Sequence, residues 1–301
     1  MAKRILFTGG GGVGNELIWR LLKGKYELFF CDHNIKKINP IIPQKNIIKV
    51  PRVKEKNYLN KIKSICKKKL IDILVPGIDE ELILLKKNEN NLPELYLPSL
   101  KTIKVCNDKW KFYQYCLLNN INSPKTSLAE DYKSNLHSSK VILKPRFGRG
   151  SEGIILSKSP LLTMLQIKIL KNKNLLKKYI IQDFVKGDEF TVTHFKINNF
   201  SNLFPLLVKE KKGITNRAVY SQNEIMINFC NNIAKNFDYD KIFNIQLIKK
   251  LKKCYIIEIN PRISTTFCML LINKIDPFIN SKSKKIKIKK RTLERYVTNF
   301  T

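Results

Sequence analysis

The stretch IFNIQLIKKLKKCYIIEINPR, residues 242–262, decides how the rest of the chain is interpreted. Two apolar segments, Ile242–Ile248 and Tyr255–Ile259, flank a basic run of four lysines and one leucine. Apolar runs on either side of a short polar turn predict a β-hairpin. We therefore expect two neighbouring strands here, with the polar side chains of both strands gathered on one face of a sheet.

Gln246 lies on the first strand of this hairpin, and Glu258 and Asn260 lie two apart on the second. Side chains two apart on a strand share a face, so the pairing is expected to form one oxygen-rich corner. Such ligands suit Mg²⁺, or Mn²⁺ in its place, with water and nucleotide phosphates completing the coordination. Arg262 follows Pro261 and is placed to reach a phosphate. A polar strand end without a ligand is the alternative interpretation.

The composition is that of a globular protein with one to three domains: 301 residues, 43% hydrophobic and 10% aromatic. The formal net charge is +33, from 57 Lys and Arg against 24 Asp and Glu. Such a charge would ordinarily suggest nucleic acid or an anionic membrane as partner. The lysines are spread along the whole chain, however, and we infer only an attraction for anionic substrates such as nucleotides.

The seven cysteines form no C-x-x-C motif and mostly lie in apolar surroundings, so free buried thiols are expected. The amino terminus has only a short apolar run before its glycines, which is not typical of a signal peptide. No apolar run approaches membrane-spanning length. These features predict a protein of the reducing cytoplasm that has no membrane partner.

The first part of the chain alternates apolar strands with amphipathic helices, which predicts a parallel, doubly wound sheet. The expected strands and helices are Arg4–Thr8, a helix after 9–15, Tyr26–Cys31, Ile47–Val50, Tyr58–Lys69 and Ile71–Pro76. A segment with two prolines, Leu92–Leu100, is then expected to be a linker.

Glycines 9, 11 and 14 match the dinucleotide-binding spacing G-x-G-x-x-G, with Asp32 about 20 residues further on. Taken alone, this pattern predicts an NAD-binding domain. Because Gly9–Gly12 are contiguous, several registers fit the motif by chance. We therefore keep an NAD-dependent oxidoreductase as an alternative, although no clear catalytic His or Lys–Tyr arrangement accompanies the motif.

The middle of the chain carries two lysines in settings that suit phosphate. Lys109 lies in the first turn of a predicted helix capped by Asn107, where a bound phosphate would offset the unfavourable helix dipole. Lys144 ends the predicted strand Val141–Pro145. A loop follows whose backbone N–H groups can wrap phosphate oxygens, through Gly148, Gly150, Ser151 and Gly153. Without a following G-K-[ST] it is not a Walker A motif, and an ordinary surface hairpin is the alternative.

The second half continues with apolar strands. Tyr179–Val185 predicts a strand that leads through a short turn into Glu189–Ile197, and Leu203–Lys211 predicts another strand. We expect Gly213–Arg217 to be a loop that supplies Arg217 to a phosphate. The basic tail, 281–301, is typical of a solvated charge run or of a lysine-guarded sheet edge.

Taken in order, these landmarks resemble the ATP-grasp superfamily, in the version found in the large subunit of carbamoyl-phosphate synthetase. The resemblance rests on N-D-K at 107–109, K-P with the glycine loop, Q-D-F-V at 182–185, and Asn-x-Gln followed by Glu-x-Asn-Pro-Arg at the end. It implies an α/β fold, with a Rossmann-like parallel-sheet domain at 1–105 and a two-lobed α+β ATP-grasp domain at 106–301.

The resemblance also implies roles for individual residues. Lys109, Lys144 and the glycine loop would hold the phosphates of ATP, and Glu189 would hold the ribose hydroxyls. The backbone around Gln182, Asp183, Phe184 and Val185 would pair with adenine. Gln246, Glu258 and Asn260 would bind the metal, with Arg262 and Arg217 as catalytic residues. Loops of the first domain would form the acceptor-substrate side, through Gly11, Gly12, Asn15, Asp79 and Glu80.

The implied activity is ATP-dependent ligation, in which a carboxylate becomes an acyl phosphate and is joined to an amine or similar nucleophile. The expected partners are small-molecule substrates, and a homodimer is left open. A non-catalytic basic protein for nucleotides or nucleic acid is a further alternative. Against nucleic acid, the aromatic residues are not interleaved with the basic ones as stacking platforms would be.

Overall fold

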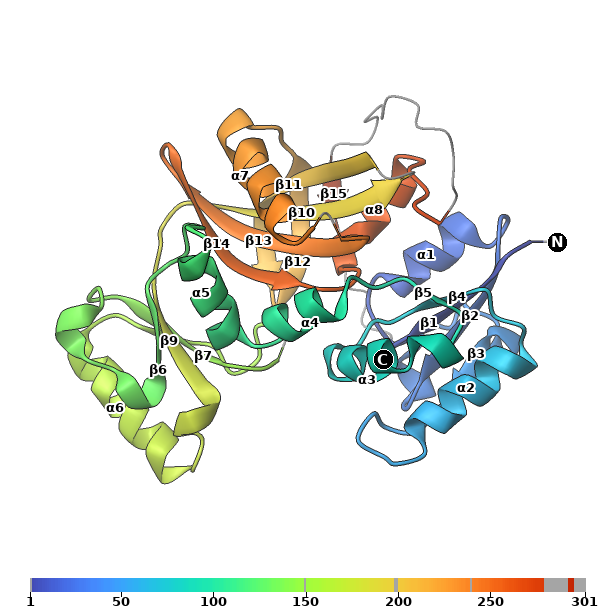
Figure 1. Ribbon diagram of the computed structural model, residues 1–301, viewed down its shortest axis with the longest axis horizontal. Helices are drawn as coiled ribbons and strands as arrows, with labels where there is room; N and C mark the ends of the chain where they lie inside the picture. The colour runs from blue at the N-terminus through green and yellow to red at the C-terminus, as the bar shows by residue number, and fades with distance from the viewer. Residues whose placement is uncertain (1, 149, 198–199, 239, 279–291, 295–301) are drawn as a thin grey trace.

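Three β-sheets organise the chain in the computed structural model, which describes residues 2–148, 150–197, 200–238, 240–278 and 292–294. The amino-terminal sheet is parallel, and the other two are antiparallel. Figure 1 shows the parallel sheet on the right, the larger antiparallel sheet above the centre and the smaller one on the left. The α/β fold class predicted from the sequence is confirmed.

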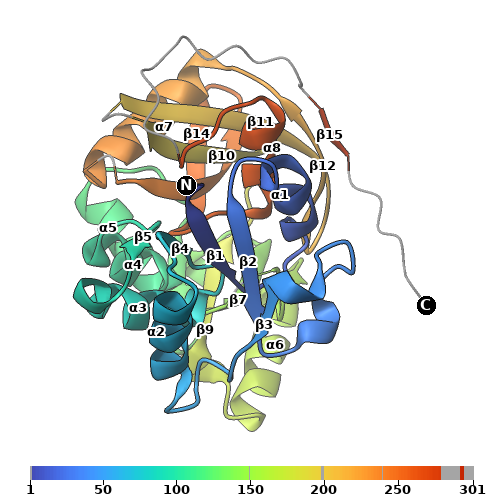
Figure 2. The same cartoon turned by 90° about the vertical axis from the view of Figure 1, so that its right-hand side faces the viewer.

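The parallel sheet has five strands in the order β3-β2-β1-β4-β5. In Figure 2, β2 lies between β1 and β3, and α2 lies beside the sheet. The strands are β1 (Arg4–Thr8), β2 (Glu27–Asp32), β3 (Ile47–Lys49), β4 (Ile73–Val75) and β5 (Glu94–Leu95), and the helices are α1 (Asn15–Leu22), α2 (Tyr58–Lys68) and α3 (Leu82–Lys87).

One prediction about this region is wrong in part. The segment 92–100, expected to be a linker, contains β5, which pairs in parallel with β4. A strand of two residues has no periodicity that a sequence pattern could reveal, and its flanking prolines suggested a linker instead.

The large antiparallel sheet has six strands in the order β14-β13-β10-β11-β12-β15. The predicted hairpin is confirmed as β13 and β14. The elements are β10 (Asp188–Ile197), β11 (Phe200–Lys212), β12 (Ile214–Tyr220), β13 (Ile242–Lys250), β14 (Lys253–Asn260), β15 (Thr292–Glu294), α7 (Glu224–Asn236) and α8 (Cys268–Ile272). Apart from β15, the basic tail at 281–301 lies outside the described residues.

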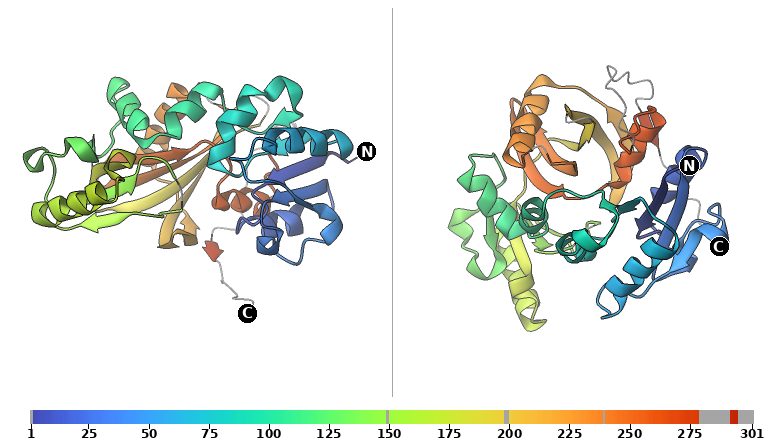
Figure 3. Two further views of the ribbon diagram at one scale, coloured as in Figure 1. Left: turned by 90° about the horizontal axis from the view of Figure 1, so that it is seen from below. Right: turned by 45° about the vertical axis from the view of Figure 1, so that its right-hand side comes forward.

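The small antiparallel sheet has four strands in the order β6-β9-β7-β8. Figure 3 shows this sheet and the parallel sheet at opposite ends of the molecule, with the large sheet between them. Its elements are β6 (Thr126–Leu128), β7 (Val141–Pro145), β8 (Ile155–Ser157), β9 (Tyr179–Asp183) and α6 (Pro160–Asn172), and two helices precede it, α4 (Leu100–Cys106) and α5 (Lys109–Leu118).

Short 3-10 turns complete the described structure. None of the helices in the described ranges combines the length and apolar character needed to cross a lipid bilayer. The turns are η1 (Ile35–Lys37), η2 (Gln44–Asn46), η3 (Asp79–Glu81), η4 (Glu89–Asn91), η5 (Ala129–Asp131), η6 (Ser134–Leu136), η7 (Leu176–Lys178) and η8 (Thr265–Phe267).

A single hydrophobic core joins the parallel sheet to the large antiparallel sheet. Phe7 and Phe30 of the parallel sheet are stacked, and Phe7 also contacts Phe278 edge to face. Phe278 packs in turn against Phe267, which is fully buried. The same core includes Phe204 of the large sheet. Two parts of the chain that are far apart in sequence therefore share one interior.

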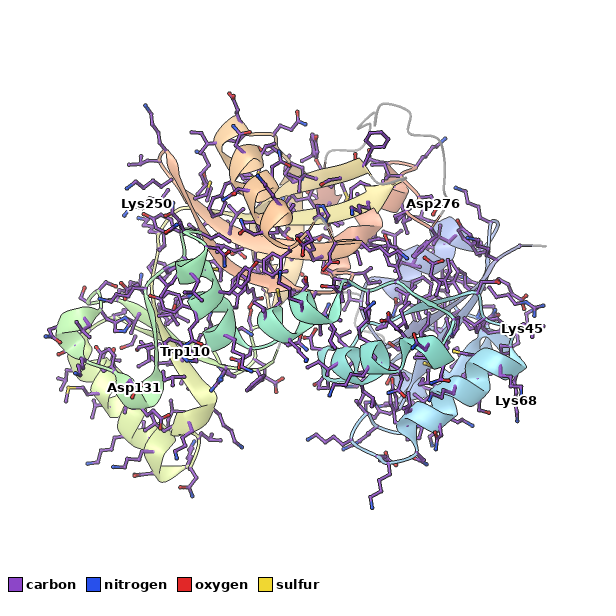
Figure 4. All side chains as sticks on the ribbon, in the orientation of Figure 1. Lys45, Lys68, Trp110, Asp131, Lys250 and Asp276 are labelled. Atoms are coloured by element: carbon purple, nitrogen blue, oxygen red, sulfur yellow. The ribbon has the colours of Figure 1, made fainter. Side chains whose placement is uncertain are left out.

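A polar contact follows the same junction. The hydroxyl of Tyr26 donates to Asp276 Oδ2 at 3.0 Å, and Lys25 Nζ lies 3.5 Å from the same oxygen. Figure 4 shows Asp276 at the boundary between the large sheet and the amino-terminal part. Figure 4 places Lys45 and Lys68 on the outer side of the amino-terminal part and Lys250 on the far side of the molecule, at the end of the large sheet. This spread is consistent with a dispersed positive charge.

Phe267→Ala should destabilise the whole chain, because it empties the centre of the shared core. We expect a loss of about 3–5 kcal/mol of unfolding free energy. Leu118→Ala, at a side chain 83% exposed, is the matched control and should change it by less than about 0.5 kcal/mol. Urea unfolding followed by fluorescence measures both. Two separate transitions, with only one shifted by Phe267→Ala, would contradict a shared core.

Candidate active site

A cavity between the small and large antiparallel sheets gathers most of the predicted ATP and metal residues. It is bounded by β7 and β9 on one side and by β13 and β14 on the other. The predicted residues that line it are Lys109, Lys144, Gly148, Gly150, Ser151, Gln182, Asp183, Phe184, Val185, Glu189, Gln246 and Glu258. Gly153, Asn260, Arg217 and Arg262 are not among the residues that line it.

The predicted oxygen corner depends on a β-bulge in β14. Gln246 pairs with Glu258, but the next residue of β13 pairs with Ile256, so Ile257 is an extra residue on β14. The bulge lets Ile256 and Ile259, three positions apart, both enter the core while Glu258 faces the cavity. Asn260 lies two residues beyond Glu258, opposite the buried Asn244.

Three lysines surround Glu258, of which Lys109 and Lys144 are predicted from the sequence and Lys211 is not. Lys109 Nζ lies 3.5 Å from a Glu258 oxygen. Burial alone would raise the pKa of Glu258, but the positive charges of Lys109, Lys144 and Lys211 outweigh burial and hold that pKa below its ordinary value. Glu258 is therefore a carboxylate at neutral pH.

Lys211 is the residue that the sequence analysis missed. It lines the cavity from β11, and its Nζ donates to Glu189 Oε1 at 2.5 Å and to Gln246 Oε1 at 3.3 Å. Glu189, expected to hold ribose hydroxyls, is thus held by an ammonium group in this structure. Lys211 lies between Glu210 and Lys212, so no sequence pattern distinguishes it.

Lys144 is almost fully buried and is held in place by an amide. Its Nζ donates to Gln182 Oε1 at 2.8 Å, and Gln182 Nε2 donates to Thr126 Oγ1 at 3.0 Å. Burial lowers the pKa of Lys144 to about 8, with Lys109 and Lys211 adding to the effect and Glu258 opposing it. A bound phosphate would restore the charge of this amine.

The glycine loop lies next to the start of α5. Lys109 Nζ donates to the carbonyl of Gly148 at 2.8 Å. Gly148 and Gly150 have positive φ values of 125° and 68°, which a residue with a side chain rarely adopts. The loop therefore has the backbone freedom to turn its N–H groups toward an anion. Gly153 also has a positive φ, of 71°, and a side chain there would in addition collide with Tyr179.

The expected helix cap at Asn107 is wrong by one residue. Asp108 caps α5, because its Oδ1 accepts from the backbone N–H groups of the first turn. Arg146 donates to both oxygens of the same carboxylate, each at 2.7 Å, and so ties the helix to the end of β7. Asn107 instead donates its side-chain amide to the carbonyl of Asp79 at 3.1 Å.

The predicted adenine hinge has part of its hydrogen-bonding capacity already in use. The N–H of Asp183 donates to Lys125 O at 2.8 Å, and the N–H of Phe184 donates to Lys140 O at 3.0 Å. The Asp183 carboxylate contacts His137 Nδ1 at 2.7 Å. Adenine recognition by this hinge would therefore fall to its carbonyl groups and to the N–H of Val185.

Two predicted arginines lie outside the cavity, in different settings. Arg262 forms an ion pair with Asp79 of the amino-terminal part, with Nε 2.5 Å from Oδ1. Arg217, expected in a loop, lies on β12 between β11 and β15, so that prediction of a loop is wrong. Its half-exposed side chain lies 3.5 Å from Glu294. The pairing of β12 with β15, about 75 residues later, could not be read from local sequence.

The amino-terminal glycine loop uses its polar groups on itself. Asp32 accepts from the N–H of Gly11 at 3.0 Å and from the N–H of Asn34 at 2.9 Å. Asn15 donates to the carbonyls of Gly9 and Gly10, each at 3.0 Å. The acid that an NAD site would offer to ribose is thus engaged within the loop, and the oxidoreductase alternative is not supported. Gly11 and Gly12 line a second hollow facing β12.

The donor set fits a magnesium ion that is shared with a nucleotide. Within the described part of the chain, no group of three or more His, Cys, Asp and Glu side chains suits a metal by itself. Glu258 and the amide oxygen of Gln246 face each other across the hairpin. Mg²⁺ characteristically uses one or two carboxylates and completes its shell with phosphate and water oxygens. Asn260 would be an additional oxygen ligand on the same strand.

Comparison with known families agrees with this geometry. Residues 106–266, more than half of the chain, match the ATP-grasp domain family. Residues 32–97 match the PylC-like N-terminal domain family. The chain belongs to the ATP-grasp family. The nucleic-acid-binding alternative is not supported. No curated protein matches the sequence.

Several solved structures share the fold. N5-carboxyaminoimidazole ribonucleotide synthetase from Thermotoga maritima is 16% identical, with a TM-score of 0.68, over 95% of this chain and 78% of that one. The biotin carboxylase domain of Hydrogenobacter thermophilus 2-oxoglutarate carboxylase is 14% identical, with a TM-score of 0.68 over 92% and 68%. An L-amino acid ligase from Bacillus licheniformis is 14% identical, with a TM-score of 0.66 over 89% and 69%.

ATP binding should weaken as the pH rises through about 8, because Lys144 then loses the proton that attracts phosphate. The Lys144 amine is fully protonated well below pH 8, so the affinity for ATP should be highest at low pH. Above about pH 8 the affinity should fall by up to about tenfold per pH unit. Lys144→Arg keeps its charge throughout and should remove this dependence. Titration calorimetry from about pH 7 to pH 9 measures both proteins. A wild-type affinity that is flat over this range would contradict the assignment.

Proposed function

We propose that the protein is an ATP-dependent ligase that activates a carboxylate as an acyl phosphate and joins it to an amine or similar nucleophile. The observation that carries this proposal is the corner where Gln246 and Glu258 face three lysines inside one cavity. A nucleotide polyphosphate with a bound cation fits that corner, because its phosphate oxygens would contact the lysines and its cation would contact Glu258.

The phosphate chain of ATP would lie between the glycine loop and the corner. Lys144 is assigned to the α- and β-phosphates, since it sits deep in the cavity beside the hinge. Lys109 spans from the loop carbonyl of Gly148 to Glu258, which places it along the same path. Lys211 reaches the corner from β11, which is separated from β13 by β10, and would neutralise charge on the transferring γ-phosphoryl group.

Magnesium bound by Glu258, Gln246 and Asn260 would neutralise phosphate charge and hold the phosphates in line for transfer. Phosphoryl transfer needs positioning and preorganised charge more than covalent help from the protein. The lysines and Arg262 are suited to this task because they need not reorganise greatly when charge moves from the γ-phosphate to the bridging oxygen. Arg217 would take part only if β12 moved toward the cavity.

The acceptor substrates would bind beyond the γ-phosphate, toward the amino-terminal part. Arg262 and Asp79 lie on that side, and the loop at Gly11, Gly12 and Asn15 lies near Thr265 through Gly14. The similar structures include an L-amino acid ligase and a carboxylase domain bound to bicarbonate and MgADP. We therefore propose a small carboxylate, such as an amino acid or bicarbonate, as the activated substrate.

We also keep residues 1–105 and 106–301 as the two domains and place the protein in the cytoplasm. All seven cysteines are buried and free, which suits a reducing compartment. A homodimer remains open as a proposal.

The nucleotide product should be ADP with inorganic phosphate, because the charged groups gather at the γ end of the phosphate path. Hydroxylamine added to Mg-ATP and a panel of amino acids and bicarbonate should trap an activated amino acid as a hydroxamate. Chromatography of the nucleotides, with a colorimetric hydroxamate assay, measures both outcomes. Stoichiometric AMP and pyrophosphate would contradict the acyl phosphate route.

Glu258→Gln should abolish turnover while largely sparing nucleotide binding, because it removes the only metal-binding carboxylate of the corner but keeps its shape. Lys144→Ala should do the reverse and mainly weaken ATP binding. Saturating Mg-ATP at about a hundred times its Kd should stabilise wild type and Glu258→Gln by about 2.7 kcal/mol. Thermal melts and ADP formation measure the two effects. Wild-type turnover in Glu258→Gln would show that the metal corner is misassigned.

A further inference from the structure

Arg262 is held by a residue from the other side of the molecule. Its Nε lies 2.5 Å from Asp79 Oδ1, and its Nη2 lies 3.3 Å from Asp79 Oδ2. Asp79 belongs to η3, which follows β4 of the parallel sheet, whereas Arg262 lies two residues after the end of β14 of the large sheet. The pair therefore joins the amino-terminal part to the end of the strand that carries Glu258.

Asp79 itself has little freedom to move. Glu81, the last residue of the same turn, is fully buried. Its carboxylate accepts from the N–H groups of Gly77 and Ile78 at 3.2 and 3.1 Å. The hydroxyls of Thr8 and Tyr58 donate to the same carboxylate. These contacts anchor the turn to the interior of the parallel sheet.

A second contact fixes Asp79 from the other side. Asn107, at the end of α4, donates its amide to the carbonyl oxygen of Asp79 at 3.1 Å. Asp79 is thus held by its backbone, and its carboxylate is presented to Arg262 from a rigid support. Both carboxylate oxygens are used, so the plane of the guanidinium group is set as well as its position.

The pairing leaves Arg262 able to bind a second anion. A guanidinium group has five N–H donors. Within the described part of the chain, Nε and Nη2 each direct one toward Asp79, and Nη1 directs one to Ile263 O at 2.9 Å. Two donors, one on each terminal nitrogen, remain for a phosphate or carboxylate oxygen.

We propose that Asp79 is a positioning residue, which orients Arg262 from the amino-terminal domain so that its two remaining donors meet the transferring phosphoryl group. Arg262 without this partner would sample many rotamers, and ordering it during the reaction would cost free energy at the transition state. The inference rests on the proposed phosphoryl transfer. It assigns Asp79 a role through Arg262, in place of the direct contact with acceptor substrate expected from the sequence.

The test compares wild type, Asp79→Ala, Asp79→Asn, Arg262→Ala and the double alanine variant. Calorimetry measures affinity for Mg-ADP alone and for Mg-ADP with aluminium fluoride, a mimic of the phosphoryl group in transfer. Asp79→Ala should leave the affinity for Mg-ADP alone unchanged. The increase in affinity that aluminium fluoride provides should be about 100-fold smaller in this variant than in wild type. Asp79→Asn should lose less, because it keeps one acceptor. The double variant should be no worse than Arg262→Ala alone.

Glu94→Gln is the matched control. Glu94 forms an ion pair with Lys241 that also links the amino-terminal part to the large sheet, away from the cavity. Glu94→Gln should keep the full increase in affinity that aluminium fluoride provides. This result would show that weakening the junction between the two parts does not by itself reduce that increase.

Three outcomes would overturn part of the assignment, and they differ from one another. If Asp79→Ala bound Mg-ADP with aluminium fluoride as tightly as wild type does, the positioning role would be overturned while the proposed function stayed intact. An additive loss in the double variant would mean that Asp79 acts independently of Arg262, as a direct ligand would. Absence of any gain from aluminium fluoride in wild type would count against phosphoryl transfer itself.

Discussion

Glu258 carries its negative charge in a partly buried corner, and the surrounding ammonium groups are what make that charge tolerable there. A buried carboxylate is costly without compensation, and so is a buried amine such as Lys144. Lys109, Lys144 and Lys211 together lower the pKa of Glu258 below its ordinary value, while Glu258 opposes the loss of the proton from Lys144. The charges of the corner therefore compensate one another within the protein. A bound nucleotide with its cation would offer phosphate oxygens to the lysines and a positive charge to Glu258.

Much of this corner could be predicted from the sequence because its determinants are local. A hairpin places residues of two adjacent segments side by side, so the spacing of Gln246, Glu258 and Asn260 was informative once the strands were recognised. Lys109 and Lys144 were recognisable for a similar reason, since each lies where a helix begins or a strand ends. The order of such landmarks along the chain then indicated the family.

The remaining features depend on contacts that no short segment specifies. The bulge at Ile257 is visible only once both strands are paired, and it decides which side chains enter the core. Lys211 lies within a basic stretch of a basic chain, so nothing in the pattern set it apart from its neighbours. Arg217 was misread because β12 is completed by β15, whose partner strand is remote in sequence. Alternating hydrophobicity and charge in a sequence indicate a strand or a surface. Which of these residues meet in a site depends on how the strands pair.

The shared core bears on how the two halves of the molecule act together. Phe7 and Phe30 pack in the same interior as Phe204 and Phe267, so the parallel sheet is held in a fixed position beside the large sheet. The turn at Asp79 can hold Arg262 in one orientation only if the parallel sheet itself does not move. The buried carboxylate of Glu81 extends this rigidity to the turn at Asp79. Through Asp79 and Arg262 the amino-terminal part is therefore coupled to the chain just after β14, although none of its described residues lines the cavity between the antiparallel sheets.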